Sequence, residues 1–411
     1  MTALAVLFLI NVLNFYDRQA LGAIAEPLSR EFHLTDTQFG ALSTVFTVIY
    51  GLAGLPLGRL ADTSSRKRLL AAGVTVWAGL TGLGGLSVSY AMLLATRLGV
   101  GIGEAVCAPA ATSWIGDAVP AARRTHALAM FMMAVPVGGL LSFSIGGPVE
   151  QAYGWRAALA LAALPSIVLV PAALWLKEPK RKAAGTAGAS SPAELIRIPA
   201  FWWIAASGAI VNFALYSFSS FFSAFLTRFH HLSVARAGVW VGVGSGAAGI
   251  LGALAAGALG DRVGHFNLGQ ARMRLASAAS LAAAPAALVA ISAPAGEIAL
   301  AVPMMMVAYG LLQMYYGLVY AAMQDVVPAN LRGAAMGGYF VVQYLGGAAW
   351  GPLVIGRLSD HFARLAASAG MAADAARAAG LHQAMYAIPA LALALAAVLW
   401  GGASAITSKG R

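Results

Sequence analysis

The sequence has few charged residues and almost no cysteine. Only 10% of its 411 residues are Asp, Glu, Lys or Arg, whereas soluble domains carry about a quarter, so the chain cannot cover itself with a polar surface. The single cysteine, Cys107, excludes an internal disulfide. A nucleotide-binding loop and a Ser-His-Asp arrangement at membrane depth are also missing. The one histidine pair with a possible metal-binding spacing, His230 and His231, is interpreted as interfacial. These absences argue against an enzyme, a metal site, a cofactor and an ATP-driven pump.

What the sequence has in abundance is apolar residues. They make up 60% of the chain, and the mean hydropathy is +0.77. A helix needs roughly 20 apolar residues to cross the hydrocarbon core of a bilayer. We therefore predict an all-α membrane protein with twelve transmembrane helices at about 3–27, 38–60, 69–88, 91–113, 126–148, 155–176, 200–226, 235–258, 272–292, 297–322, 334–356 and 382–405.

The basic residues predict the orientation of these spans. If both termini are cytoplasmic, 17 of the 26 Lys and Arg residues fall on the inner side and 7 on the outer side, with Arg18 and Arg97 left inside spans. This imbalance satisfies the positive-inside rule. It explains the net charge of +11 without a nucleic-acid partner, and it predicts a multi-pass protein of the inner (plasma) membrane.

The chain also repeats itself. "GDAVPAARRTHALAMF" begins at Gly116 and "QDVVPANLRGAAMGGYF" at Gln324, before the fifth and the eleventh predicted span. Between the halves, 177–199 is basic and then rich in Gly, Ala and Ser, as in a flexible cytoplasmic linker. The predicted organisation is a six-helix bundle over 1–176, this linker, and a second six-helix bundle over 200–411. Parallel repeats of six spans are the architecture of major facilitator transporters.

Several motifs carry a family resemblance. "GRLADTSSRKR" resembles the loop 2–3 motif of the major facilitator superfamily, and a degenerate copy follows in the second half. "RLGVGIGEA" resembles its Arg-x-x-x-Gly-x-Gly pattern in span four. The loop motif and its copy imply a cytoplasmic gate that stabilises one conformation without touching substrate, formed by Gly58, Asp62, Arg66, Lys67, Asp261 and Arg262.

Within that superfamily the chain is most similar to the Spinster family. The stretches that carry this similarity are "YDRQALGAIAEPLSREFHLTDTQFGAL" at 16–42, "GIGEAVCAP" at 101–109, "YGWRAAL" at 153–159 and "GPLVIGRLSD" at 351–360. The resemblance implies proton-linked export of lysophospholipid or sphingolipid-type molecules. Anion:cation symporters of the superfamily share the Asp-Arg pair of span one and the Gly-x-Gly-Glu-Ala of span four, so a small organic anion stays an open alternative.

Three charges inside the predicted spans need an explanation. Asp17, Arg18 and Glu104 lie near mid-span, where a charge costs about 2.5–3.5 kcal/mol. The resemblance implies that spans one, four, seven and ten line a central cavity, which places the three at similar depth. We expect Glu104 to carry the proton, alternately gaining and losing Arg18, with Asp17 sharing this role or orienting Arg18. The alternative is a static network that holds helix one to helix four.

Arg97 and Glu104 are predicted to share a helix face. Seven residues make nearly two turns, so the two lie about 10 Å apart along the axis, and Gly101 between them is expected to open space. Two guanidinium groups, Arg18 and Arg97, suit a phosphate or carboxylate. The other substrate-binding candidates are uncharged, with helix packing as the alternative role, namely Asn14, Asn212, Tyr216, Ser217, Phe221, Gln313, Tyr316 and Gln343.

Together these features predict a proton-coupled secondary transporter. The expected substrate is an amphipathic lipid or anion, moved by a monomer that is surrounded by membrane lipids. A proton symporter of a small organic anion and a multidrug efflux protein are the alternatives. A receptor-like protein without transport is a further one.

Overall fold

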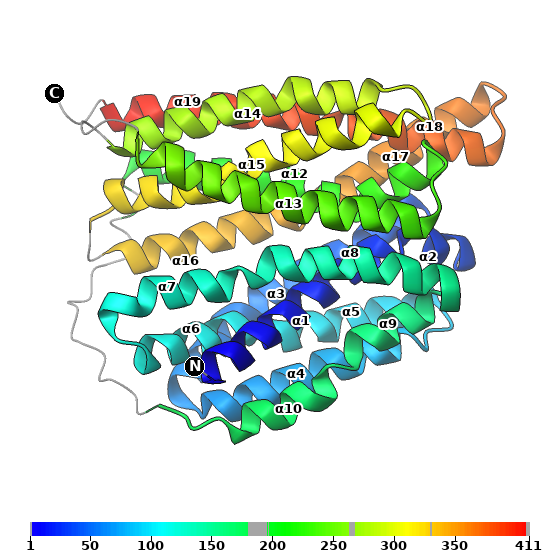
Figure 1. Ribbon diagram of the computed structural model, residues 1–411. Coiled ribbons are helices and arrows are strands. Elements are labelled where there is room, and N and C mark those ends of the chain that lie inside the picture. The colour runs from blue at the N-terminus through cyan, green and yellow to red at the C-terminus, as the bar shows by residue number, and fades with distance from the viewer. Residues whose placement is uncertain (1, 180–194, 196, 263–267, 329–330, 408–411) are drawn as a thin grey trace. The chain divides into compact units, whose positions relative to one another are not determined.

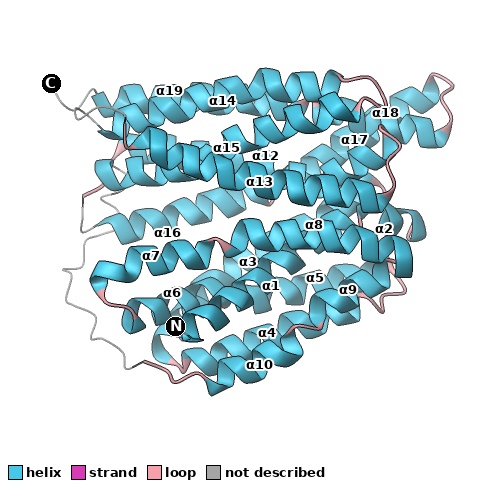
Figure 2. Cartoon of the chain, viewed as in Figure 1, coloured by secondary structure: helices cyan, strands magenta, loops and turns pink. Residues whose placement is uncertain are grey.

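The computed structural model describes residues 2–179, 195, 197–262, 268–328 and 331–407. Over these ranges the chain is helical and contains no strand (Figure 2). The predicted all-α class is therefore confirmed. Most of the predicted linker, 180–194 and 196, lies outside the described residues.

Two compact units make up the chain, and each is described by itself. Unit 1 comprises Met1–Ala183 with Ser219–Thr227 and Leu232–Gly246, and unit 2 comprises Ala184–Phe218, Arg228–His231 and Ala247–Arg411. The first part of the chain forms ten helices (Figure 1): α1 (Thr2–Ala23), α2 (Ala25–Glu31), α3 (Asp36–Thr63), α4 (Arg66–Gly84), α5 (Tyr90–Glu104), α6 (Cys107–Ala118), α7 (Ala121–Met132), α8 (Ala134–Tyr153), α9 (Trp155–Ala163) and α10 (Ser166–Trp175).

The later part of the chain forms longer helices and one π-helical turn. Two of the helices, α12 and α13, contribute residues to both units. In chain order the elements are α12 (Pro199–Arg228), α13 (Val234–Gly260), α14 (Leu268–Ser292), α15 (Ile298–Val326), α16 (Arg332–Gln343), the π-helix η2 (Tyr344–Ala348), α17 (Gly351–Ser368), α18 (Ala373–Met385) and α19 (Ala387–Thr407).

Nine segments of the described chain are long and apolar enough to cross a membrane. The predicted spans 3–27, 69–88 and 334–356 are helical but are not among the nine. The first carries the charges of α1, and α4 opens on three successive basic residues. The third is interrupted by η2, and a π turn inside an α-helix is frequently found at a functional site.

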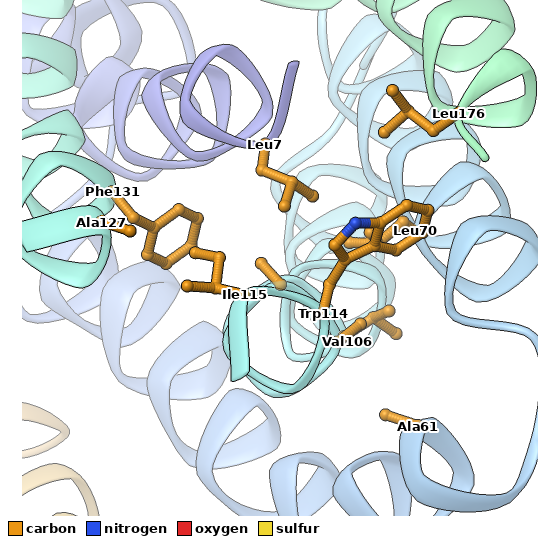
Figure 3. Packing of buried hydrophobic residues seen from close by; sticks show 11 residues of the cluster. Leu7, Ala61, Leu70, Val106, Trp114, Ile115, Ala127, Phe131 and Leu176 are labelled. Carbon is orange, nitrogen blue, oxygen red and sulfur yellow. The ribbon is translucent and has the colours of Figure 1, made fainter. Parts of the chain in front are cut away.

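Apolar side chains hold the helices of unit 1 together. Figure 3 shows one cluster, in which Leu7 of α1 lies near Trp114 and Ile115 of α6 and Phe131 of α7. All four are buried. Since full burial of such a side chain contributes about 1.5–3 kcal/mol, this cluster fixes α1 against α6 and α7 at one end of the helices that carry the candidate site.

Candidate functional site

An ion pair joins α1 to α5 inside unit 1. Arg18 Nη2 lies 3.1 Å from Glu104 Oε2, and Arg18 Nε donates to the same oxygen at 3.3 Å. The side chains are 4% and 0% exposed. The predicted contact between Arg18 and Glu104 is therefore present in the structure.

Aromatic rings and an amide surround the Arg18 guanidinium. Its Cζ lies 4.3 Å from the centroid of the Tyr50 ring and 4.8 Å from that of Phe15, within the range of a cation–π interaction. Arg18 Nη2 also donates to Asn14 Oδ1 at 3.2 Å. The site thus combines one charge pair, one amide and ring faces, a set that suits a ligand with both polar and apolar parts.

Asp17 takes part in a second, separate cluster. Arg97 Nη1 lies 3.6 Å from Asp17 Oδ1. The Thr81 hydroxyl of α4 donates to Asp17 Oδ2 and accepts from Arg97 Nη2 at 3.2 Å. Arg97 was predicted beside a substrate anion, and Asp17 was predicted to share the proton with Glu104 or to orient Arg18; the structure pairs Asp17 with Arg97. Thr81 was missed, because a threonine in an apolar span carries no sequence signal.

Two glycines bring three helices together around Glu104. A Cβ on Gly101 would lie 2.8 Å from the Phe46 carbonyl oxygen of α3, and one on Gly103 would lie 2.8 Å from the Trp77 nitrogen of α4. Any larger residue would push these backbones apart. The expectation that Gly101 opens space was therefore wrong, because α3 fills that position. The glycines of the Arg-x-x-x-Gly-x-Gly pattern act by close helix packing.

Burial makes these charges dependent on their partners. Taking two ions out of water is expensive unless each finds an opposite charge and further hydrogen bonds. The first cluster satisfies Glu104 on one oxygen only, because Oε1 has no hydrogen-bond partner among the described residues. The Asn14 amide nitrogen is likewise without one. The arrangement leaves hydrogen-bonding capacity for a proton or a ligand beside Arg18.

Unit 2 contains a polar network without charge. Asn212 Oδ1 accepts from the Tyr316 hydroxyl at 3.0 Å and from Gln343 Nε2 at 3.2 Å. Gln343 Oε1 in turn accepts from the Tyr320 hydroxyl at 3.4 Å. Three predicted substrate-binding residues, Asn212, Tyr316 and Gln343, are therefore in direct contact.

Tyrosines extend this network along α15. Gln313 Nε2 donates to the Tyr309 hydroxyl at 2.8 Å. Tyr309, Gln313, Tyr316 and Tyr320 follow one another at spacings of four, three and four, which place them on one helix face. Tyr309 and Tyr320 were missed, although this spacing in the sequence could have identified them.

The remaining candidates of α12 lie in different surroundings. Ser217 donates to the Phe213 carbonyl of its own helix at 2.7 Å, and the Tyr216 ring meets that of Tyr344 at 6.4 Å between centroids. Phe221 belongs to unit 1, where its ring is 5.7 Å from that of Phe39. Nothing in these contacts tests a role in substrate binding.

Arg66 is the centre of the predicted gate. It is fully buried, and its guanidinium contacts Asp117 Oδ2 at 2.5 Å, Glu178 Oε1 at 3.1 Å and the Pro179 carbonyl at 2.9 Å. Burial alone would raise the pKa of Glu178, but hydrogen bonds from Ser65 and from the Arg66 backbone and side chain outweigh it and lower that pKa. Asp117 was noticed only as a repeat residue.

The other gate residues are less enclosed. Gly58 and Lys67 are half-buried, and Asp261 and Arg262 are exposed; the side chain of Asp62 lies outside what the structure describes. In the second repeat, the Asp117 equivalent is Asp325, which contacts Arg272 at 2.6 Å. In each copy of the sequence repeat, the aspartate therefore forms an ion pair with an arginine.

In the described ranges no three His, Cys, Asp or Glu side chains lie close enough to hold a metal ion. The free Cys107 is buried, and its thiol lies 3.8 Å from Asn11 Oδ1. Asn11 also donates to the Phe131 carbonyl at 3.0 Å, so this pair acts in packing.

Comparison with known proteins decides the family. A sequence profile described as Major Facilitator Superfamily matches residues 7–352. The chain belongs to the Major Facilitator Superfamily. Members of this superfamily are transporters, so the predictions of a transporter and of no enzymatic activity are confirmed, as is a multi-pass membrane protein.

Individual relatives agree with this assignment. An "MFS-type efflux pump" of Mycolicibacterium smegmatis is 31% identical over 87% of this chain and 84% of its own length. "Protein spinster homolog 1" of Mus musculus is 27% identical over 87% and 73%. "Sphingosine-1-phosphate transporter SPNS2" of Danio rerio is 29% identical, over 56% of this chain and less than half of its own length.

Among solved structures, a bacterial homologue of the human lysosomal transporter Spinster, in an inward-facing and unoccupied conformation, superposes with a TM-score of 0.88. It is 26% identical over 99% of this chain and 97% of the other. The predicted Spinster-like major facilitator transporter is confirmed.

Proposed function

We propose that this major facilitator protein couples proton movement to the transport of an amphipathic lipid by alternating access. The observation that carries the proposal is the ion pair between Arg18 and Glu104, enclosed in unit 1 with one Glu104 oxygen unsatisfied. Ionisable groups inside a membrane are expensive and by default functional. In this proposal Glu104 takes up the proton, which releases Arg18 from its carboxylate.

In this proposal, protonation of Glu104 couples the proton to the substrate because it frees the charge of Arg18. Arg18 loses its counter-ion when Glu104 becomes neutral, and an anionic or zwitterionic headgroup can then take that place. Proton binding and substrate binding would thus use the same guanidinium. Arg97 contacts Asp17 and Thr81 instead, so in this proposal Arg18 is the guanidinium that the headgroup reaches.

The uncharged polar and aromatic residues of unit 2 favour a lipid as the substrate. The Tyr316–Asn212–Gln343 network offers hydroxyl and amide groups, and ring pairs such as Phe218 with Tyr309, 4.9 Å apart, offer apolar surface. An amphiphile presents chemistry of both kinds. The similarity to SPNS2, whose name states sphingosine-1-phosphate transport, supports the same class.

Two alternative functions are supported by similar proteins. Multidrug efflux is favoured by the "MFS-type efflux pump", and a sugar-acid substrate by a "Probable L-galactonate transporter" of Escherichia coli, 31% identical over 38% of this chain. We further propose that both termini are cytoplasmic, which the distribution of Lys and Arg supports, and that the protein acts as a monomer in the plasma membrane. The gate role of Arg66 belongs to the same proposal.

Uptake into proteoliposomes tests these functions side by side. Vesicles holding the full chain are given a labelled lysophospholipid, a sugar acid or a cationic dye, with an imposed pH gradient or with that gradient collapsed by an ionophore. We expect gradient-dependent movement of the lysophospholipid alone. Movement of only the sugar acid or only the dye would replace the lipid proposal, and equal rates without the gradient would refute proton coupling.

A further inference from the structure

A threonine hydroxyl connects two buried charges in unit 1. Thr81 of α4 donates to Asp17 Oδ2 of α1 and accepts from Arg97 Nη2 of α5. The direct distance from Arg97 Nη1 to Asp17 Oδ1 is 3.6 Å, longer than the 3.1 Å of the Arg18–Glu104 pair. Thr81 is itself fully buried. One side chain therefore joins three helices and completes an otherwise loose ion pair.

The two carboxylates of the site are held differently. Asp17 has a hydroxyl on one oxygen and a guanidinium near the other. Glu104 has Arg18 on one oxygen. The second oxygen of each carboxylate, Oδ1 of Asp17 and Oε1 of Glu104, has no hydrogen-bond partner in the described part of the chain. Asp17 is thus tied to α4 and α5, while Glu104 depends on the side chain of Arg18.

The electrostatic surroundings of Asp17 are supplied by α1 and α5. The element that brings Thr81, α4, adds no charge at this level. The titratable and charged side chains that interact with Asp17 are Arg97 and Glu104 of α5 and Arg18 and Tyr16 of α1. Any change in how Asp17 is held therefore acts on Glu104 as well.

We infer that Thr81 is a positioning residue for proton coupling, which it serves by holding Asp17 on Arg97 so that Glu104 alone exchanges the proton. This inference rests on the proposed function. Hydrogen bonds to charged groups are roughly twice as strong as neutral ones, and a buried carboxylate that loses its donor becomes a competing proton acceptor. Removal of the hydroxyl would make Asp17 share the proton with Glu104.

The test is the pH profile of lipid uptake in proteoliposomes. For Thr81→Val, which keeps the shape and removes the hydroxyl, we expect the midpoint to move toward higher pH by about one unit. Thr81→Ser keeps the hydroxyl and is expected to restore the wild-type midpoint. The matched control is Thr96→Val, because Thr96 is buried but donates only to the Leu93 carbonyl of its own helix, at 2.7 Å.

The outcomes separate this inference from the function beneath it. If wild-type uptake ignores the pH gradient, proton coupling is wrong and the role of Thr81 is wrong with it. If wild-type uptake follows the gradient and Thr81→Val keeps the wild-type midpoint, only the inference is overturned, as it is if Thr96→Val shifts equally. Should Thr81→Val not fold, Thr81→Cys, whose thiol is a weak donor, is measured with the same criteria.

Discussion

The polar interiors of the two units are built from different chemistry. In unit 1, the polar cluster around α1 and α5 contains two carboxylates and two guanidinium groups, from Asp17, Arg18, Arg97 and Glu104. The network in unit 2 is made of tyrosine hydroxyls and amides centred on Asn212. Carboxylates exchange protons in the physiological range when their partners change, whereas amides do not titrate and tyrosine hydroxyls ionise only near pH 10. Proton chemistry is thus expected from unit 1 and shape recognition from unit 2.

The largest effect on stability is expected when a buried charge loses its counter-ion. Arg18→Leu removes the counter-ion of Glu104 and should lower the free energy of unfolding by about 3–5 kcal/mol. Thermal unfolding of the purified protein in detergent measures it. The control is Arg156→Leu, because Arg156 and its partner Glu31 are 44% and 41% exposed and such a pair contributes about 1 kcal/mol or less.

A double variant sharpens this prediction. Arg18→Leu combined with Glu104→Leu removes both charges and should recover much of the stability that Arg18→Leu loses. Equal stability of Arg18→Leu and Arg156→Leu would mean that Glu104 is not enclosed in the way the structure indicates.

A substitution in the polar network of unit 2 should lower the free energy of unfolding by less, and it should leave the pH dependence of uptake unchanged. Asn212→Leu takes away the acceptor of Tyr316 and Gln343 and should cost about 1–3 kcal/mol. The apparent KM for lipid is expected to rise while the pH midpoint of uptake stays that of the wild type. A shifted midpoint would contradict the division of roles between the units.

The two repeat-related ion pairs offer a third comparison. Arg66 is fully buried and reaches Asp117, Glu178 and a backbone carbonyl, whereas Arg272 reaches Asp325 with both side chains partly exposed. Lysine cannot reproduce the guanidinium fork. We expect Arg66→Lys to cost about 2 kcal/mol and Arg272→Lys less than about 1 kcal/mol, by the same unfolding measurement; the reverse order would refute the burial argument.

The smallest effect is an acid dependence of stability through Glu178. Its pKa in the folded protein lies below the ordinary 4.5, so its stabilising contribution is complete above that pH. That contribution is lost as the pH falls through the lowered pKa. Glu178→Gln should therefore lower the free energy of unfolding at pH 7. In acid, the difference in this free energy between the variant and the wild type should become smaller. A gap that stays constant between pH 7 and pH 3 would show that the carboxylate charge contributes nothing.

The helical class and the pairing of Arg18 with Glu104 could be predicted from the sequence. Apolar runs of span length and rare charges within them carry both conclusions, because lipid makes each charge costly. The repeat motif pointed to Asp117 and Asp325, although Asp62 was expected as the acid of the gate and Asp117 was given no role there.

The contacts between side chains within the site could not be predicted from the sequence. Whether Arg97 faces Glu104 or Asp17 depends on the rotation and approach of α1, α4 and α5, which small residues such as Gly101 and Gly103 set by close contact. Thr81 has no distinguishing neighbour in sequence. Gly101 was expected to leave open space because the sequence does not say which backbone fills that position.

Gradient-driven lipid uptake by Glu104→Gln tests the central claim most directly. The glutamine keeps the size and a hydrogen-bond acceptor for Arg18 but cannot exchange a proton, and Glu150→Gln in α8, a half-buried acid, is the control. The account predicts that an imposed pH gradient no longer accelerates uptake by Glu104→Gln, while Glu150→Gln follows the wild type. Full gradient-driven uptake by Glu104→Gln would contradict it.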